Sequence, residues 1–273
     1  MIRIITESSC DLTPERAGAI GVELIYMKLT FGEEEYIDKV TITNEEFYRK
    51  LETTEEMPGT TLINTGEFIE IFDRYPEDDL IVLTISSKLG GTFHAAGLAK
   101  EQCGRENIYI IDSRSVSAAM GLLVQKAAQI RDTGASAEEI YRQLLSYRDR
   151  LHLIAVVDTL KYLIKGGRLS KATGYIGNVL NIKPILLLSC DGEPVIYDKV
   201  RGFKNALKKI KQYVEEKLPP DENEIMGYGH ADAPEGAKEL KALMGLEGDI
   251  YTIGSIVGSH AGPGTVGMAY FSK

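Results

Sequence analysis

Leu80-Ile81-Val82-Leu83-Thr84-Ile85, followed by Ser86-Ser87-Lys88-Leu89-Gly90-Gly91-Thr92, is the stretch of this 273-residue chain that decides the fold. A continuous apolar run of this length is typical of a strand buried on both faces, and the turn after it leads into a helical pattern. The same succession of strand, turn and helix begins at residue 2 and again at residue 107. This alternation predicts an α/β fold with an N-terminal, mostly parallel sheet and helices on both faces.

Helix caps and apolar runs give the other elements of the first half. Pro14 after Thr13 begins a helix that Gly21 ends. Thr43 and Ser136 are each followed three residues later by glutamate, the capping-box pattern of a helix start. The remaining predicted elements are strands at residues 2–6, 22–31 and 107–111, and a long helix at 115–131.

The second half follows a different pattern. Asp191-Gly192 lies between two strand-like runs, which is the signal of an antiparallel hairpin. Hairpins mixed with helices predict a C-terminal α+β domain, and we place the boundary near residue 150, giving domains 1–150 and 151–273. The predicted elements are strands at 153–157, 184–189 and 194–200 and helices at 160–164, 172–180 and 203–218.

The composition excludes several classes of function. A net charge of −9 and a pI near 5.1 argue against a nucleic-acid surface. No stretch approaches the ~18 apolar residues of a membrane helix, and the apolar start is too short for a signal peptide. Three isolated cysteines, Cys10, Cys103 and Cys190, and four scattered histidines suggest neither disulfides nor a metal site. We therefore expect a cytoplasmic protein.

Residues 262–267, Gly-Pro-Gly-Thr-Val-Gly, match the dinucleotide fingerprint G-x-G-x-x-G. The match fails physically, because only six residues follow where a helix and a distant acidic residue are needed. An apolar run at 253–257 precedes the segment and a strand-like run at 268–271 follows it. His260 is therefore predicted in a glycine-rich turn between two strands, where free backbone N–H groups can face an anion.

Three other turns are candidates for chemistry, and each has a plainer interpretation. Residues 7–11 follow the first strand and can either bind a ligand or cap a helix. Residues 86–92 offer hydroxyls and a helix N-terminus to an anion, or simply make room for packing. Residues 165–170 favour a solvated connection. No G-x-S-x-G or Walker motif is present, although a hydrolase stays open because catalytic triads are spatial rather than sequential.

Taken in order, these segments resemble the DegV family, bacterial fatty-acid-binding proteins. The resemblance covers nearly the whole chain and depends on residues 4–12, 85–92, 111–113, 165–170, 177–184 and 259–264. It implies a two-domain α/β protein that buries one long-chain fatty acid between its domains, without a cofactor. It further implies that the protein is an acyl-carrying subunit with no catalytic residues of its own. A separate ATP-dependent kinase is then expected to phosphorylate the carboxylate of the bound acid, and the acyl phosphate to enter phospholipid synthesis.

The resemblance also implies which residues meet the carboxylate. The family's threonine, its Ser-Gly-Thr turn and its histidine map onto Thr60, Gly90-Gly91-Thr92 and His260. Two departures stand out: residue 90 is glycine instead of serine, and Thr60-Thr61-Leu62-Ile63 replaces a Thr-Ser-Gln-Pro turn. We hypothesise that Thr92, Ser87 or Lys88 compensates for the missing hydroxyl.

The size of the acyl chain decides whether Gly90 prevents binding. Burying about 14 methylenes at roughly 0.8 kcal/mol each contributes ~11 kcal/mol before ordering costs. A lost hydrogen bond to a charged group costs on the order of 1.5–3 kcal/mol. We therefore expect the ligand to bind despite the substitution.

Two further arginines match family positions, and the resemblance makes both of them candidate contacts with the kinase. Arg201 corresponds to an arginine in the kinase-facing region, and Arg168 to one in the glycine turn.

Two other interpretations of the chain stay open. It could be a hydrolase or phosphotransferase that uses the Ser and His turns, or a carrier of another amphiphilic anion.

Overall fold

Strand β1 (Ile2–Glu7) lies inside a parallel sheet in the computed structural model, which describes residues 1–169 and 181–273. The strand order is β2-β1-β6-β7, and every neighbouring pair is parallel. The predicted parallel sheet is therefore confirmed. Its other strands are β2 (Val22–Ile25), β6 (Asp79–Thr84) and β7 (Ile108–Asp112).

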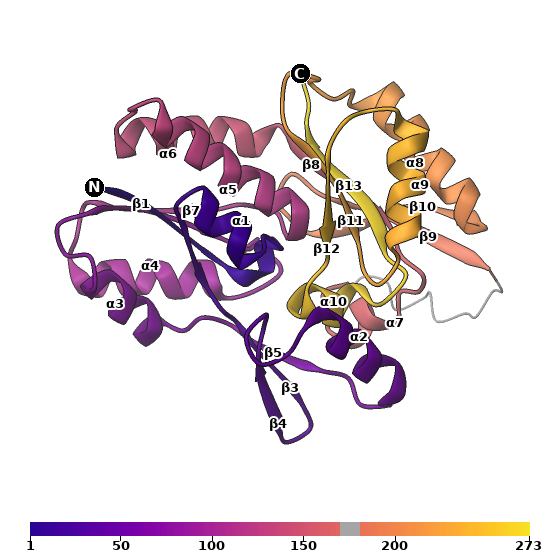
Figure 1. Ribbon diagram of the computed structural model, residues 1–273, viewed down its shortest axis with the longest axis horizontal. Coiled ribbons are helices and arrows are strands. Elements are labelled where there is room, and N and C mark those ends of the chain that lie inside the picture. The colour runs from indigo at the N-terminus through magenta and orange to yellow at the C-terminus, as the bar shows by residue number, and fades with distance from the viewer. Residues whose placement is uncertain (170–180) are drawn as a thin grey trace.

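Helices cover both faces of this sheet (Figure 1). Successive side chains of a strand point to opposite faces, so Ile4 packs with α5 and α6 while Ile5 packs with α3 and α4. Capping boxes begin α2 and α6 as predicted, and Pro14 is the first residue of α1. The helices of this half are α1 (Pro14–Ala19), α2 (Asn44–Thr53), α3 (Thr65–Asp73), α4 (Thr92–Cys103), α5 (Ser117–Asp132) and α6 (Ala137–Asp149).

The second half forms a mixed sheet with the order β10-β9-β8-β13-β11-β12. Strands β9 and β10 pair as an antiparallel hairpin across Asp191-Gly192, as predicted. Helices α8 and α9 cover one face of the sheet, and α5 packs against part of the other. The elements are β8 (Leu151–Val156), β9 (Ile182–Leu188), β10 (Pro194–Arg201), α8 (Phe203–Lys217), β11 (Met226–His230), α9 (Pro234–Met244), β12 (Asp249–Thr252) and β13 (Val266–Phe271).

The boundary predicted near residue 150 falls between the last residue of α6 and the first residue of β8. The division into domains 1–150 and 151–273 stays a prediction. The helix predicted at 172–180 lies outside the described residues.

The single strand predicted at 22–31 is wrong. Strand β2 ends at Ile25, and the N–H of Met27, two residues later, donates to Oγ of Ser8 at 3.2 Å. The following residues belong to a separate small sheet, seen below the larger sheets in Figure 1. Its order is β4-β3-β5, with β3 (Lys28–Phe31), β4 (Glu34–Ile37) and β5 (Gly59–Thr61).

The turn predicted around His260 is also wrong, because residues 255–261 form helix α10 (Ser255–Ala261). β-branched residues such as Ile256 have modest helix propensity, and here tertiary contacts override it. Asp11 and Asp38 of the N-terminal half accept hydrogen bonds from the start of this helix. The remaining short elements are the 3₁₀ turn η1 (Ser8–Cys10) and α7 (Lys161–Lys165).

Candidate functional site

An apolar cavity lies between the two large sheets. Its walls come from the turn after β6, the start of α5, the inner face of the C-terminal sheet, and helices α7 and α10. The cavity has a volume of about 200 Å³, far more than the ~10–15 Å³ that one water needs. Its apolar lining includes Met27, Leu62, Ile85, Leu89, Val116, Leu153, Ala155, Val157, Leu163, Leu186, Leu188, Pro194, Ile253, Ile256 and Val257.

Small residues in three neighbouring strands leave room for this cavity. Gly229 of β11 pairs with Gly267 of β13, which pairs with Ala155 of β8, and all three line the cavity. Larger side chains in this row would project into the same space. We did not single out Gly229 or Ala155 from the sequence, although a glycine inside a strand is a known sign of close approach.

Thr60 and His260 form a polar pair in the cavity wall. Oγ1 of Thr60 lies 3.1 Å from Nε2 of His260, although 200 residues separate them in sequence. Burial and the neighbouring Arg168 charge lower the pKa of His260 to about 4, so the imidazole is neutral at pH 7. Nδ1 of His260 is buried and has no hydrogen-bond partner among the described residues.

Arg168 lies beside this pair and also lines the cavity. Its Nε donates to the carbonyl of Leu89 at 3.1 Å, and Nη1 donates to the carbonyl of Gly166 at 2.6 Å. Partial burial lowers the pKa of Arg168, but an arginine stays charged at neutral pH. We call Thr60, Arg168 and His260 the polar end of the cavity.

The turn predicted to hold the headgroup lies against the same cavity. Gly90, Gly91 and Thr92 all line it, with Leu62 packed close to Gly91. The Thr92 hydroxyl, however, donates to Oε2 of Glu7 at 3.2 Å. A hydroxyl has only one proton, so Thr92 cannot also donate to a ligand while this bond exists.

Glu7, the first residue of the candidate turn at 7–11, is a buried carboxylate whose contact with the turn at 85–92 was not predicted from the sequence. It holds both ends of the turn, because Oε1 accepts from the N–H of Ile85 at 2.6 Å while Oε2 accepts from Thr92. Burial raises the pKa of Glu7 to about 7.

Three predicted residues are not among those that line the cavity. Lys88 is exposed, and Ser87 is half-buried with its N–H donating to Asp112 at 3.2 Å. Arg201 is exposed at the end of β10. The structure thus brings Thr60, Gly90, Gly91, Thr92, Arg168 and His260 together and leaves Ser87, Lys88 and Arg201 apart from them.

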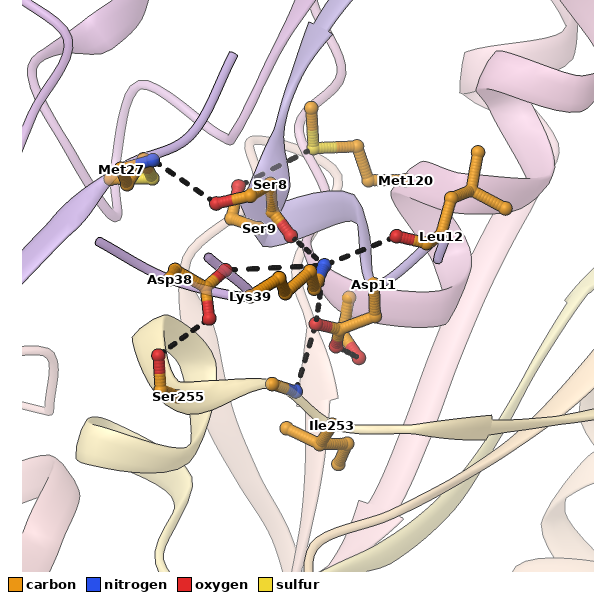
Figure 2. Close-up of polar contacts among 12 residues, drawn as sticks. Ser8, Ser9, Asp11, Leu12, Met27, Asp38, Lys39, Met120, Ile253 and Ser255 are labelled. Carbon is orange, nitrogen blue, oxygen red and sulfur yellow. Dashed lines mark hydrogen bonds and ion pairs between the residues drawn. The ribbon is translucent and has the colours of Figure 1, made fainter. Parts of the chain in front are cut away.

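A buried polar cluster fixes the helix that carries His260 (Figure 2). Asp11 accepts from the N–H of Gly254 at 2.9 Å, and Asp38 accepts from Oγ of Ser255 at 2.5 Å. Lys39 lies between both carboxylates, 4.0 Å from each, and its Nζ donates to the carbonyl of Ser8 at 2.6 Å. The turn at residues 7–11 is therefore occupied by an internal lysine.

The polar end can bind an anionic headgroup but lacks a complete catalytic triad. Thr60 and His260 resemble a nucleophile and its base, yet no carboxylate in the described part of the chain orients Nδ1 of His260. Within residues 1–169 and 181–273, no group of His, Cys, Asp and Glu is placed to hold a metal ion. No helix in those ranges is long and apolar enough to span a membrane.

An α/β protein with a parallel sheet, a second mixed sheet, a buried apolar cavity between them and one cationic polar end has clear relatives. The family model described as "Uncharacterised protein, DegV family" matches residues 1–273. A DegV domain-containing protein of Caldanaerobacter subterraneus subsp. tengcongensis is 35% identical over 279 residues, covering 100% of this chain and 99% of the relative. The chain belongs to the DegV family.

Solved structures of the family have the same fold over 98–100% of this chain. The fatty-acid-binding DegV family protein of Streptococcus agalactiae has a TM-score of 0.89 and 26% identity, covering 100% of this chain and 99% of its own. A DegV family protein of Ruminococcus gnavus, solved with vaccenic acid, has a TM-score of 0.88 and 25% identity, covering 98% and 99%. The resemblance and the fold class inferred from the sequence are both confirmed.

Proposed function

We propose that this protein binds one long-chain fatty acid, with the carboxylate at the polar end and the acyl chain in the apolar cavity. The observation that carries the proposal is the Thr60–His260 pair beside Arg168, the one charged side chain among the described residues of a mostly apolar lining. An arginine, a hydroxyl and an imidazole can together hold one carboxylate by charge-assisted hydrogen bonds. The fatty acids bound by structural relatives support this assignment.

The charge balance of the polar end supports an anion of single charge. Arg168 supplies one positive charge, and His260 is neutral because its pKa is lowered to about 4. One carboxylate therefore neutralises the site without proton uptake. The backbone of Gly90 and Gly91 can approach the headgroup closely, since neither residue carries a side chain.

The protein is proposed to act as a carrier rather than as an enzyme, in the cytoplasm. We propose that a separate ATP-dependent kinase phosphorylates the bound carboxylate and that the acyl phosphate enters phospholipid synthesis. The incomplete Thr60–His260 pair supports a carrier, because the carrier itself needs no nucleophile. Exposed Arg201 is the proposed contact with the kinase, together with Arg168, which lines the cavity at its polar end.

Native mass spectrometry of the purified chain tests ligand binding directly. We expect a co-purifying C14–C18 acid, released by organic extraction and restored by adding the free acid. His260→Ala should weaken rebinding by about 10- to 100-fold, the effect of losing a hydrogen bond to a charged group. A chain that neither carries nor rebinds a fatty acid would contradict the proposal, and a different extracted anion would favour another amphiphile.

The kinase contact needs its own test. Arg201→Ala should lower the rate of acyl-phosphate formation with the kinase present and leave the fatty-acid Kd unchanged, because Arg201 lies outside the cavity lining. Arg168→Ala should lower the rate of acyl-phosphate formation and also weaken fatty-acid binding. An equal loss of fatty-acid binding in Arg201→Ala would show that Arg201 is structural.

A further inference from the structure

Gly229 and Gly267 are neighbours in the cavity floor, but only one of them is required by packing. A Cβ at Gly267 would lie 2.5 Å from the carbonyl oxygen of Ile154 and 2.7 Å from Cβ of Ala155. A Cβ at Gly229 would first meet Ile253, at 3.7 Å, which is an ordinary van der Waals contact. Gly229 also lacks a left-handed backbone, so conformation does not require glycine there.

Because neither packing nor conformation requires it, a glycine at this position lowers the stability of the strand. Gly229 lies inside β11 with β12 and β13 on either side, and a strand interior favours β-branched residues over glycine on a scale of about 1 kcal/mol. The absent side chain keeps space open over the sheet. Such a glycine commonly marks the close approach of a ligand.

The lining residues of the C-terminal sheet follow two directions that cross at Ala155. Along β8 and the residue that follows it, Leu153, Ala155 and Val157 cover roughly 13 Å, at about 3.3 Å per residue. Across the strands, the row Leu186, Ala155, Gly267 and Gly229 covers three strand spacings, roughly 14 Å. A chain that occupies both directions must bend near Ala155 and Gly267.

On the basis of the proposed function, we infer that Gly229 selects acyl chains with a built-in bend, those with a cis double bond. A cis chain that turns at Ala155 fills the space over Gly229 and gains its van der Waals contacts. A saturated chain of equal length either follows one direction and leaves that space unfilled, or adopts gauche torsions at an energetic cost. Gly229 is thus a specificity-determining residue of the carrier.

The test compares two acids of equal length on the full, delipidated chain. Kd is measured by calorimetry for cis-9-octadecenoic acid and for octadecanoic acid, with the native protein, Gly229→Ala and Gly229→Val. We expect the native protein to prefer the cis acid by about fivefold or more. Gly229→Val should raise the Kd of the cis acid at least tenfold and that of the saturated acid less than threefold. Gly229→Ala should have an intermediate effect.

Thermal unfolding separates this effect from damage to the fold. Valine suits a strand, so Gly229→Val should keep or raise the Tm, and Gly97→Ala, an open glycine on α4, is the control for glycine replacement. The inference is overturned if Gly229→Val loses affinity equally for both acids or keeps the native preference. It is also overturned if the native protein shows no preference between the two acids. If the native protein binds neither acid, the proposed function fails, and this inference with it.

Discussion

The imidazole of His260 occupies the space where a side chain of residue 166 would lie. A Cβ built on Gly166 would overlap Nδ1 of His260 and would also lie 2.9 Å from the carbonyl oxygen of Tyr162. Gly166 has an ordinary helical backbone, with φ of −74°, so the close approach and not the conformation requires glycine. The Gly-Gly-Arg turn therefore places both Arg168 and His260.

Gly166→Ala should displace His260 and weaken its contact with Thr60. We expect the fatty-acid Kd to rise about tenfold or more, because the headgroup loses a hydrogen-bond partner. Overpacking should also cost about 1–3 kcal/mol of stability. Calorimetry and chemical denaturation measure the two effects. Gly97→Ala, where the new Cβ meets nothing within 4 Å beyond its chain neighbours and its own helix backbone, should leave Kd unchanged; equal effects of both variants would argue against this role.

The sequence predicted the α/β alternation well because each signal there was local. Buried runs such as residues 80–85 and caps such as Thr43 need only their own neighbours in the chain. Helix α10 could not be predicted in this way. Its first turn is held by Asp11 and Asp38, more than 200 residues earlier, and these contacts override a β-like apolar run.

The site residues show the same division. Family resemblance placed Thr60 and His260, and the structure brings them within 3.1 Å. The role of Glu7 was invisible, since a carboxylate after a strand is usually solvated, and only the fold reveals that it engages Thr92. The cavity floor could have been suspected from Gly229 inside a strand pattern, but its register with Ala155 exists only in the assembled sheet.

The titration of His260 should report ligand binding. Its pKa is about 4 in the folded chain and near 6.5 when unfolded, so the unfolded state binds more protons between these values. Stability contributed by neutral His260 is therefore present above pH 6.5 and is lost as pH falls toward 4. A bound carboxylate should raise the pKa of His260, because an opposite charge favours the imidazolium.

NMR of the imidazole resonances measures this shift with and without fatty acid. His260→Gln should lack the loss of stability between pH 6.5 and 4 that the imidazole causes, judged as the difference from the native protein. Glu7 gives the opposite slope, since its raised pKa of about 7 means stability is lost as pH rises from about 4.5 to 7. If the pKa of His260 is the same with and without fatty acid, the carboxylate binds elsewhere.

Gly90→Ser should change fatty-acid affinity by less than tenfold. A Cβ at Gly90 would lie 3.4 Å from Cγ2 of Ile85, and the backbone is not left-handed, so serine fits. The added hydroxyl contributes a net hydrogen bond of about 1 kcal/mol, which is below the ~1.4 kcal/mol of a tenfold change and small beside the burial of the acyl chain. Paired Kd values of the two proteins decide this, and binding that depends wholly on the added hydroxyl would refute it.

Lys39→Met should release the helix that carries His260. Lys39 is 10% exposed at its side chain and lies between Asp11 and Asp38, so its loss leaves two buried carboxylates without a cation (Figure 2). Breaking such a buried pair costs about 3–5 kcal/mol. We expect this loss of stability in urea unfolding, together with a higher fatty-acid Kd, because the start of α10 is bonded to both carboxylates.

The pH dependence of Lys39→Met identifies the charge as the cause. Burial already raises the pKa of Asp11 to about 6, and Lys39 opposes that rise. Without Lys39 the pKa of Asp11 should rise further, so the folded variant binds more protons and its deficit shrinks as pH falls. Lys28→Met, which removes an exposed ion pair with Glu35 at 3.6 Å, should cost less than about 1 kcal/mol at every pH. A deficit of Lys39→Met that does not change with pH would mean that packing of the lysine stem, not its charge, holds α10.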